Sequence, residues 1–448
     1  MIFILLLEAL LLLVGAATGK PFLGVAAAGG VAYAILAYLH PNVAWGLVWL
    51  AFPFGIETLL PGGSALYLPT EPMIFLALAA WAARLLAGAP LRIPKSRLHL
   101  PLAALAAATL AASLLGAYPM YGVKALVMAS AYVSFGYLYC LVAVDDAARP
   151  ERLVPWIVGS AAVWGIYGTV KVIAEGVSLR NAYGAVRPFF SEHGGYGAYL
   201  AMIFPLALLV ALERRGRAMF LYASASIAIL LGIVFSFTRA AWVSLAVVLP
   251  PILGLWFWWR RSARPLVLLG SAGLVLVLVL AGIGASEGVG RHVESIGEKG
   301  DVSNLERLNR WMAATEMLKQ HPFFGVGFAA YPNVYHLYRR KVVLTGLAYQ
   351  SMGPHSEVFR LLSETGFVGF AAACWFLLTA ALVGLNVFRW SDDPRVKMLV
   401  LAVMAGIGTY AIHGFFRTYL DLEKVCVPFW ASFGVIAAME QGVKRPTA

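Results

Sequence analysis

Long apolar segments recur along almost the whole chain, and they constrain its fold more than any other feature. A helix that crosses a bilayer needs about 20 consecutive, mostly apolar residues. Segments of that kind recur from Met1 to about Glu440, and hydrophobic residues make up 61% of the chain against 12% charged residues. Because the segments are apolar throughout and do not alternate, they favour spanning helices over the strands of a membrane barrel. We therefore predict an all-α, polytopic membrane protein.

The spacing of these segments predicts about 12–14 transmembrane helices. The N-terminal segment lacks the charged start and cleavage site of a signal peptide, so we interpret it as the first span. Residues 42–60 could instead form a re-entrant or merged segment. The candidate segments are 1–19, 22–39, 42–60, 72–90, 98–117, 120–143, 153–175, 194–212, 218–236, 240–259, 265–285, 366–388, 397–416 and 425–440.

The connections between the segments divide by charge. Six of them are short and basic: 91–97, 145–152, 213–217, 260–264, 389–397 and 441–448. Basic connections face the cytoplasm in most membrane proteins, and placing all six there puts both termini inside. This bias accounts for the net charge of +12 without a nucleic-acid partner. The three cysteines lie in or beside apolar segments, so we expect neither a disulfide nor a metal cluster.

The remaining connections then face outward, and one of them is far longer than an ordinary connection. It runs from Ser286 to Thr365, and such a length usually marks a functional loop. We therefore divide the chain into helices at 1–285, the long loop at 286–365 and C-terminal helices at 366–448. The shorter outward connections are 61–71, 176–193 and 416–424.

Within the long loop, Ser303 followed by Glu306 is a capping-box pattern that predicts the start of a helix. Pro322 and the following Gly-Val-Gly predict its end. This helix carries Arg307 and Arg310, which have two alternative interpretations. They could contact lipid headgroups from an interfacial helix, or they could bind a substrate. The tyrosines and basic residues at 331–341 favour an interfacial belt, with recognition of an anionic lipid as the alternative.

The stretch SMGPHSEVFRLLSETGFVGF, residues 351–370, places a histidine just before an apolar segment. Gly353-Pro354 disfavours helix, so a helix is expected to begin near His355 or Ser356. Thr365-Gly366 is expected to break or bend that helix before the span. A single histidine is more often structural than catalytic, but arginines in the same loop are suited to binding the phosphates of a lipid carrier.

Residues 307–369, about a seventh of the chain, resemble the signature region of the O-antigen ligase and polymerase superfamily. The motifs RLNRW, HPFFGVGFAAY and PHSEVFRLLSETGFVG follow one another in the family's order. Arg187 in AVRPFF matches a family arginine by position, although the usual Gly and Asn residues after it are replaced by PFFSEHGG. Arg239 in FSFTRAAW matches a further family element, and local helix capping is its alternative role.

The resemblance implies a bacterial inner-membrane enzyme that acts at the periplasmic face among membrane lipids. Members transfer a glycan from undecaprenyl diphosphate to an acceptor. In ligases the acceptor is lipid A-core, and in polymerases it is a growing glycan on its own carrier. We expect O-antigen ligation on the compact match at 307–369, with polymerisation as the alternative. Protein O-glycosylation, a polysaccharide transporter and a structural scaffold are less expected.

For this chemistry, His355 is the expected base for the acceptor hydroxyl. Arg187 and Arg307 are expected to hold the diphosphate. The further substrate-binding candidates are Arg239, Arg310 and Glu364. With no carboxylate nucleophile in evidence, we expect direct attack with inversion. The sequence lacks a metal-binding HExxH or paired acidic motif, so we expect neither metal nor other cofactor. A metal site in which His336 or His321 joins His355 and Glu357 is the alternative.

Overall fold

The computed structural model describes residues 10–11, 13–14, 21–59, 65–90, 93–141, 154–261, 302–339 and 352–442. Within these ranges the protein is almost entirely helical, as predicted for the all-α class. Six helices in them are long and apolar enough to cross a membrane. The protein is therefore described as a multi-pass membrane protein. The predicted segment 265–285 lies outside the described residues.

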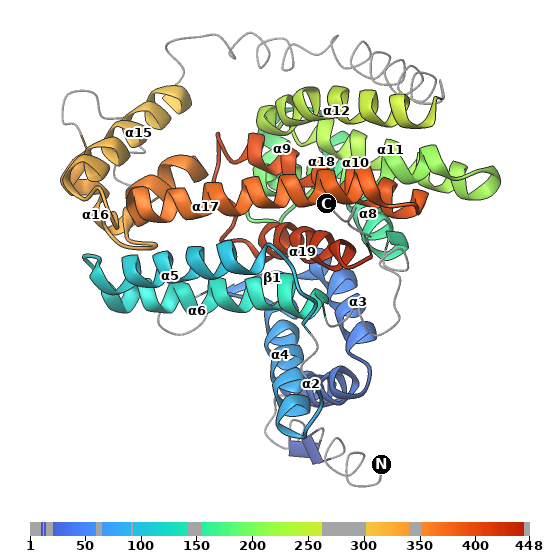
Figure 1. Ribbon diagram of the computed structural model, residues 1–448, viewed down its shortest axis with the longest axis horizontal. Coiled ribbons are helices and arrows are strands. Elements are labelled where there is room, and N and C mark those ends of the chain that lie inside the picture. The colour runs from blue at the N-terminus through green and yellow to red at the C-terminus, as the bar shows by residue number, and fades with distance from the viewer. Residues whose placement is uncertain are drawn as a thin grey trace, which may run out of the picture.

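The N-terminal part comprises the following elements (Figure 1): α2 (Pro21–Leu39), α3 (Pro41–Ala51), the short 3₁₀-helix η1 (Phe52–Phe54), β1 (Ile56–Leu59), β2 (Ala65–Leu68), α4 (Thr70–Leu86), α5 (His99–Leu115), α6 (Pro119–Val133) and the π-helical turn η2 (Ser134–Tyr139). The span considered at 42–60 is wrong, because α3 ends at Ala51. Pro53 and Gly55 follow it, and β-branched Ile56 and Thr58 lie in a strand that pairs antiparallel with β2.

The middle and C-terminal helices form a group in which α10 is central. They are α8 (Val154–Ala174), α9 (Leu179–Ala185), α10 (His193–Glu213), α11 (Gly216–Phe235), α12 (Arg239–Arg260), α18 (Pro394–His413) and α19 (Glu423–Glu440). The spanning part of α10 is entirely buried, and α10 packs against α8, α11 and α18. Small residues permit this close packing. A Cβ at Gly194 would lie 2.0 Å from the Tyr419 hydroxyl, which is closer than packed atoms approach.

The described part of the long loop forms two helices and the start of a third. These are α15 (Val302–Gln320), α16 (Tyr331–Tyr338) and α17 (Glu357–Trp390), and Figure 1 shows α15 and α16 beside one end of α17. The helix predicted before Pro322 is confirmed as α15. Its start differs in detail, since Val302 is already helical and the Glu306 carboxylate accepts a hydrogen bond from Arg310 Nε at 2.7 Å.

The bend predicted at Thr365-Gly366 is also confirmed. Gly366 has φ 63° and ψ −165°, a conformation that only glycine adopts readily, and it divides α17 into a short first part and a long second part. The backbone of the 322–327 segment packs into this bend. Phe367 N donates to the Pro322 carbonyl at 2.8 Å, and Val326 N donates to the Ser363 carbonyl at 2.8 Å. The bend thus fastens the GVG loop to α17.

We predict that Gly366→Ala destabilises the protein by at least about 2 kcal/mol. The added Cβ would lie 2.4 Å from the Phe323 carbonyl carbon, and alanine disfavours this backbone conformation. Thermal unfolding in detergent measures the change. Gly254→Ala in α12 is the matched control, because its Cβ would meet nothing within 4 Å. Equal melting temperatures for the two variants would contradict this account.

Candidate functional site

His355 lies in the turn that leads into α17, and contacts on both sides fix its backbone. Its φ of 55° is in the left-handed region, which is uncommon for a non-glycine residue. On one side, Arg310 Nη1 donates to the Met352 carbonyl at 2.5 Å. On the other side, Glu357 N donates to the Gly414 carbonyl at 2.7 Å. Unusual backbone held by its surroundings in this way is typical of functional positions.

The imidazole of His355 contacts an arginine from another connection. Arg417 Nη1 lies 3.0 Å from His355 Nδ1. A guanidinium only donates hydrogen bonds, so Nδ1 must accept, and the neutral ring therefore carries its hydrogen on Nε2. The sequence analysis missed Arg417. It lies in the connection 416–424, which the sequence analysis predicts to face outward, and its position there was the available signal.

The surroundings of His355 oppose its protonation. Burial, and then the positive charges of Arg417, Arg310 and Arg307, lower the pKa of the imidazole to about 3. His355 is therefore neutral at physiological pH. The structure thus brings together three sequence-predicted residues, His355, Arg307 and Arg310, and adds Arg417 to them.

Glu357 joins the start of α17 to the connection that carries Arg417. Its Oε1 accepts hydrogen bonds from the Tyr410 hydroxyl at 2.7 Å and from the backbone N–H groups of Tyr419 and Leu420 at 3.1 and 3.2 Å. Its Oε2 accepts from Arg360, with Nε at 2.7 Å and Nη2 at 2.6 Å. This buried carboxylate therefore fixes the 414–420 turn against α17, and with it the distance between Arg417 and His355.

Arg310 and Arg307 have different surroundings although they share one helix. Arg310 is completely buried, pairs with Glu306 and lies over the ring of Tyr335 at 4.6 Å. Its Nη1 faces the carbonyl groups of the 352–353 turn, so its contacts favour positioning of His355. Arg307 is partly exposed and close enough to His355 for its charge to act on the ring.

The other sequence-predicted residues are Glu364, Arg187 and Arg239, and they differ in burial and in their contacts. Glu364 is buried, and its carboxylate accepts from Tyr331 N at 3.3 Å, which holds the GVG loop to α17. Arg187 is exposed, and its Nε donates to the Ser191 carbonyl at 3.3 Å. Arg239 is the partly buried first residue of α12.

The turn before Arg239 is fastened to the start of α10. His193 Nδ1 donates to the Ser236 carbonyl at 2.6 Å, and the Thr238 hydroxyl donates to the His193 carbonyl at 3.1 Å. The segment that carries Arg187 therefore packs against the segment that carries Arg239. The ring of Tyr183 lies 3.9 Å from that of His193 and extends the same cluster.

A second buried histidine lies beside Arg417. His413 ends α18 and is 1% exposed, and neither of its ring nitrogens has a hydrogen-bond partner among the described residues. Arg417, Arg307 and His193 are close enough for their charges to act on it. The sequence analysis did not single out His413, because an apolar segment surrounds it. It extends the imidazole and guanidinium cluster towards α10.

The residues considered for a metal site are separated or engaged elsewhere. His321 Nε2 lies 3.2 Å from the Tyr338 hydroxyl, His336 is exposed, and the Glu357 carboxylate is occupied by Arg360 and Tyr410. Within the described ranges, no group of three or more histidine, cysteine or acidic side chains is arranged to hold a metal ion.

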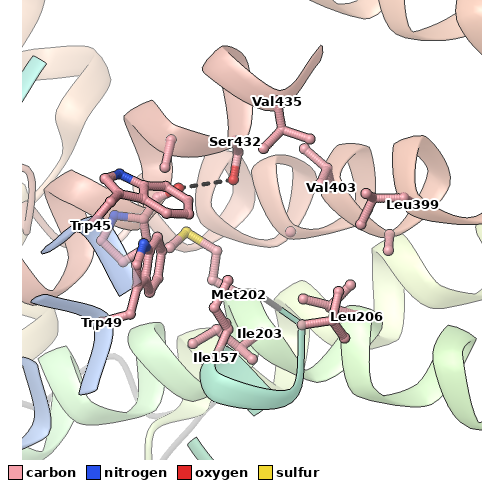
Figure 2. Close-up of a pocket in the computed structure, with 15 residues that line it drawn as sticks. Trp45, Trp49, Ile157, Met202, Ile203, Leu206, Leu399, Val403, Ser432 and Val435 are labelled. Atoms are coloured by element: carbon pink, nitrogen blue, oxygen red, sulfur yellow. Dashed lines mark hydrogen bonds between the residues drawn. The ribbon is translucent and has the colours of Figure 1, made fainter. Parts of the chain in front are cut away.

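An apolar cavity of about 70 Å³ lies elsewhere in the helix bundle (Figure 2). Trp45 and Trp49 from α3 and Met202 from α10 line it, together with residues of α8, α18 and α19. Its labelled polar residue, Ser432, donates its hydroxyl to the Pro428 carbonyl at 2.9 Å. The lining includes no charged side chain and does not include His355, so this cavity is suited to hydrocarbon and not to phosphate.

Comparison with known families matches residues 224–374 to the family described as O-antigen ligase. Residues 224–374 are therefore similar to the O-antigen ligase family. The match covers about a third of the 448 residues and confirms the predicted superfamily. It includes Arg239, Arg307, Arg310, His355 and Glu364, whereas the other residues described above at 183–193 and 410–420 lie outside it. No curated protein matches the chain.

We predict that Glu357→Ala lowers the free energy of unfolding by about 3–5 kcal/mol, because the change leaves the partly buried Arg360 guanidinium without its carboxylate and the Tyr410 hydroxyl without its acceptor. The melting temperature in detergent tests this. Glu316→Ala is the control, since its ion pair with Lys319 is exposed and exposed pairs contribute about 0–1 kcal/mol. If both variants have the same melting temperature, Glu357 does not hold the 414–420 turn.

Proposed function

We propose that this protein is a membrane glycosyltransferase. In this proposal it moves a glycan from undecaprenyl diphosphate to an acceptor sugar hydroxyl at the periplasmic face of a bacterial inner membrane. O-antigen ligation to lipid A-core is the favoured reaction. The observation that carries the proposal is the meeting of a neutral histidine, His355, with Arg307 and Arg417 beside an O-antigen ligase domain.

The chemistry of a lipid diphosphate donor matches this set of side chains. When the bond from the anomeric carbon to the diphosphate breaks, negative charge develops on the departing oxygen. Fixed cations in a partly dry site stabilise that charge. We assign Arg307 and Arg187 to the diphosphate, with Arg239 as a further contact. The contacts of Arg310 and Glu364 support positioning roles, since both side chains are buried and hydrogen-bonded to backbone.

The acceptor hydroxyl must lose its proton as it attacks, and a neutral imidazole accepts a proton without needing a metal ion. We assign this role to His355. Among the described residues no carboxylate contacts His355, which favours direct attack and inversion over a covalent intermediate. The acceptor oxygen bonds to the anomeric carbon as the diphosphate leaves, and its proton passes to the imidazole.

One observation bears on the transporter alternative, and the reaction product distinguishes polymerisation. The arginines gather at helix ends and in connections, which favours an interfacial enzyme over a transporter with charges at mid-membrane. Polymerisation uses the same donor and the same chemistry, with a growing glycan in place of lipid A-core. The product distinguishes the two. A ligase gives lipid A-core that carries one transferred glycan, and a polymerase gives a ladder of repeat units on the carrier.

We predict that His355→Ala and Arg307→Ala each lower the transfer rate at least about 100-fold, because one removes the base and the other a charge that faces the diphosphate. The measurement is transfer of labelled glycan from undecaprenyl diphosphate to lipid A-core by the purified protein. His336→Ala, at an exposed position of α16, is the control. Near-normal turnover in either variant would overturn the role assigned to that residue.

We also predict that chelation with EDTA leaves the transfer rate unchanged, because the arginines supply the positive charge that a metal ion supplies in other phosphate enzymes. The measurement compares the rate before and after EDTA, and again after Mg²⁺ is added. Loss of transfer with EDTA and its return with Mg²⁺ would refute the metal-free mechanism.

A further inference from the structure

Arg417, which is partly buried, differs from Arg310 and Arg360 in what it faces. Arg310 pairs with the Glu306 carboxylate and Arg360 pairs with the Glu357 carboxylate. In the described part of the chain, the ion pairs within 4.0 Å do not include Arg417. Its guanidinium contacts the neutral imidazole of His355 instead. A largely desolvated cation that faces a neutral ring is stabilised less than a paired one, and an anion nearby lowers its energy.

This contact also covers a functional atom of His355. Because Arg417 donates to Nδ1, the lone pair of the neutral imidazole is occupied, and the other nitrogen already carries a hydrogen. An imidazole in this state does not take a proton from an acceptor hydroxyl. The arrangement described by the structure is therefore one in which the proposed base is masked.

We propose that Arg417 is a positioning residue that masks Nδ1 of His355 while the donor is absent and turns to the diphosphate when the donor binds. This inference rests on the proposed function. It makes Nδ1 the basic atom of His355 and makes the presence of a lipid diphosphate the condition for its basicity. Donor binding then precedes activation of the acceptor, so an unoccupied site does not deprotonate water or a sugar.

The proton and electron pairs balance in this scheme. Departure of Arg417 exposes the lone pair of Nδ1, while Nε2 keeps its hydrogen. The acceptor O–H proton moves to Nδ1, the oxygen bonds to the anomeric carbon, and the electron pair of the breaking bond leaves with the diphosphate. The resulting imidazolium then loses its proton to water, and Arg417 returns to Nδ1 after the diphosphate departs.

Other titratable groups act on this pair from each neighbouring element. They are Arg307 and Arg310 from α15, Glu192 and Tyr183 from the 176–193 connection, Tyr419 from the 414–420 turn, and His413 from α18. The arginines disfavour the imidazolium. A bound diphosphate offsets their charge, so the pKa of His355 is expected to rise when the donor binds.

The test is ¹⁵N NMR of the histidine side chains in the full-length protein in lipid nanodiscs, with His355→Gln identifying the His355 signals. Without donor, we expect Nε2 to carry the hydrogen and the ring to stay neutral from pH 7 to pH 5. Farnesyl diphosphate, a short lipid diphosphate, should shift the Nδ1 signal and raise the pKa. A hydrogen on Nδ1, titration near pH 6.5 without the probe, or no response to the probe would overturn the proposal.

Variants of Arg417 provide a second test of the proposal. Arg417→Ala removes one lowering charge, so the pKa of His355 should rise above about 3 without any probe, while burial and the charges of Arg310 and Arg307 keep it below its usual value of about 6.5. Arg417→Lys, which keeps the charge, should keep the pKa low. Arg389→Ala, at the exposed far end of α17, is the control and should match the natural protein. An unchanged titration in Arg417→Ala would overturn the proposal.

Kinetics separate this inference from the proposed function. For a base, activity requires the neutral ring, so kcat/KM for the donor falls as pH drops below the pKa of the free enzyme. From pH 7 to pH 5 we expect a flat profile for the natural protein and a fall of about twofold or more for Arg417→Ala, since burial and the remaining arginines still lower the pKa. A profile for Arg417→Ala as flat as that of the natural protein would overturn the inference. Absence of transfer in the natural protein, with the NMR results as expected, would overturn the proposed function alone.

Discussion

The arrangement of the site depends on one buried carboxylate, that of Glu357. It accepts hydrogen bonds from Arg360, from the Tyr410 hydroxyl and from two backbone N–H groups of the 414–420 turn. A buried carboxylate is costly unless its lone pairs are satisfied, and here both oxygens are. The same contacts tie α17 to the connection between α18 and α19. Together with the hydrogen bond from Glu357 N to the Gly414 carbonyl, they hold Arg417 at 3.0 Å from His355.

A second constraint acts from the opposite side of His355. Arg310 extends from α15 to the backbone carbonyl groups of the 352–353 turn, and Glu306 neutralises it. His355 is thus held in a left-handed conformation between two networks of buried charge, one on each side. Each network contains a matched arginine and carboxylate, so neither leaves a net charge in the interior. Arg417 has no ion pair within 4.0 Å among the described residues and faces the ring, with the charge of Glu192 acting on it from further away.

Local sequence patterns predicted the elements that are encoded locally. The helix before Pro322, the bend at Gly366 and the position of His355 at the start of α17 all follow from glycine, proline and polar residues close in sequence. The prediction of a span at 42–60 was wrong because apolar composition alone does not distinguish a helix from a hairpin strand. The match to the O-antigen ligase family at residues 224–374 includes these local motifs.

The parts of the site that were missed are formed by contacts between distant segments. Nothing near Arg417 in sequence indicates that it meets His355. Glu357 lies in the PHSEVF motif, but the motif does not indicate its contact with Tyr410. The charge of the group that contacts His355 also decides how basic the imidazole is. A carboxylate beside His355 would have raised the basicity of the ring, whereas a guanidinium lowers it and occupies the lone pair. A histidine and an arginine in these two connections are thus compatible with an active base or a masked one, and only the geometry of the pair distinguishes them.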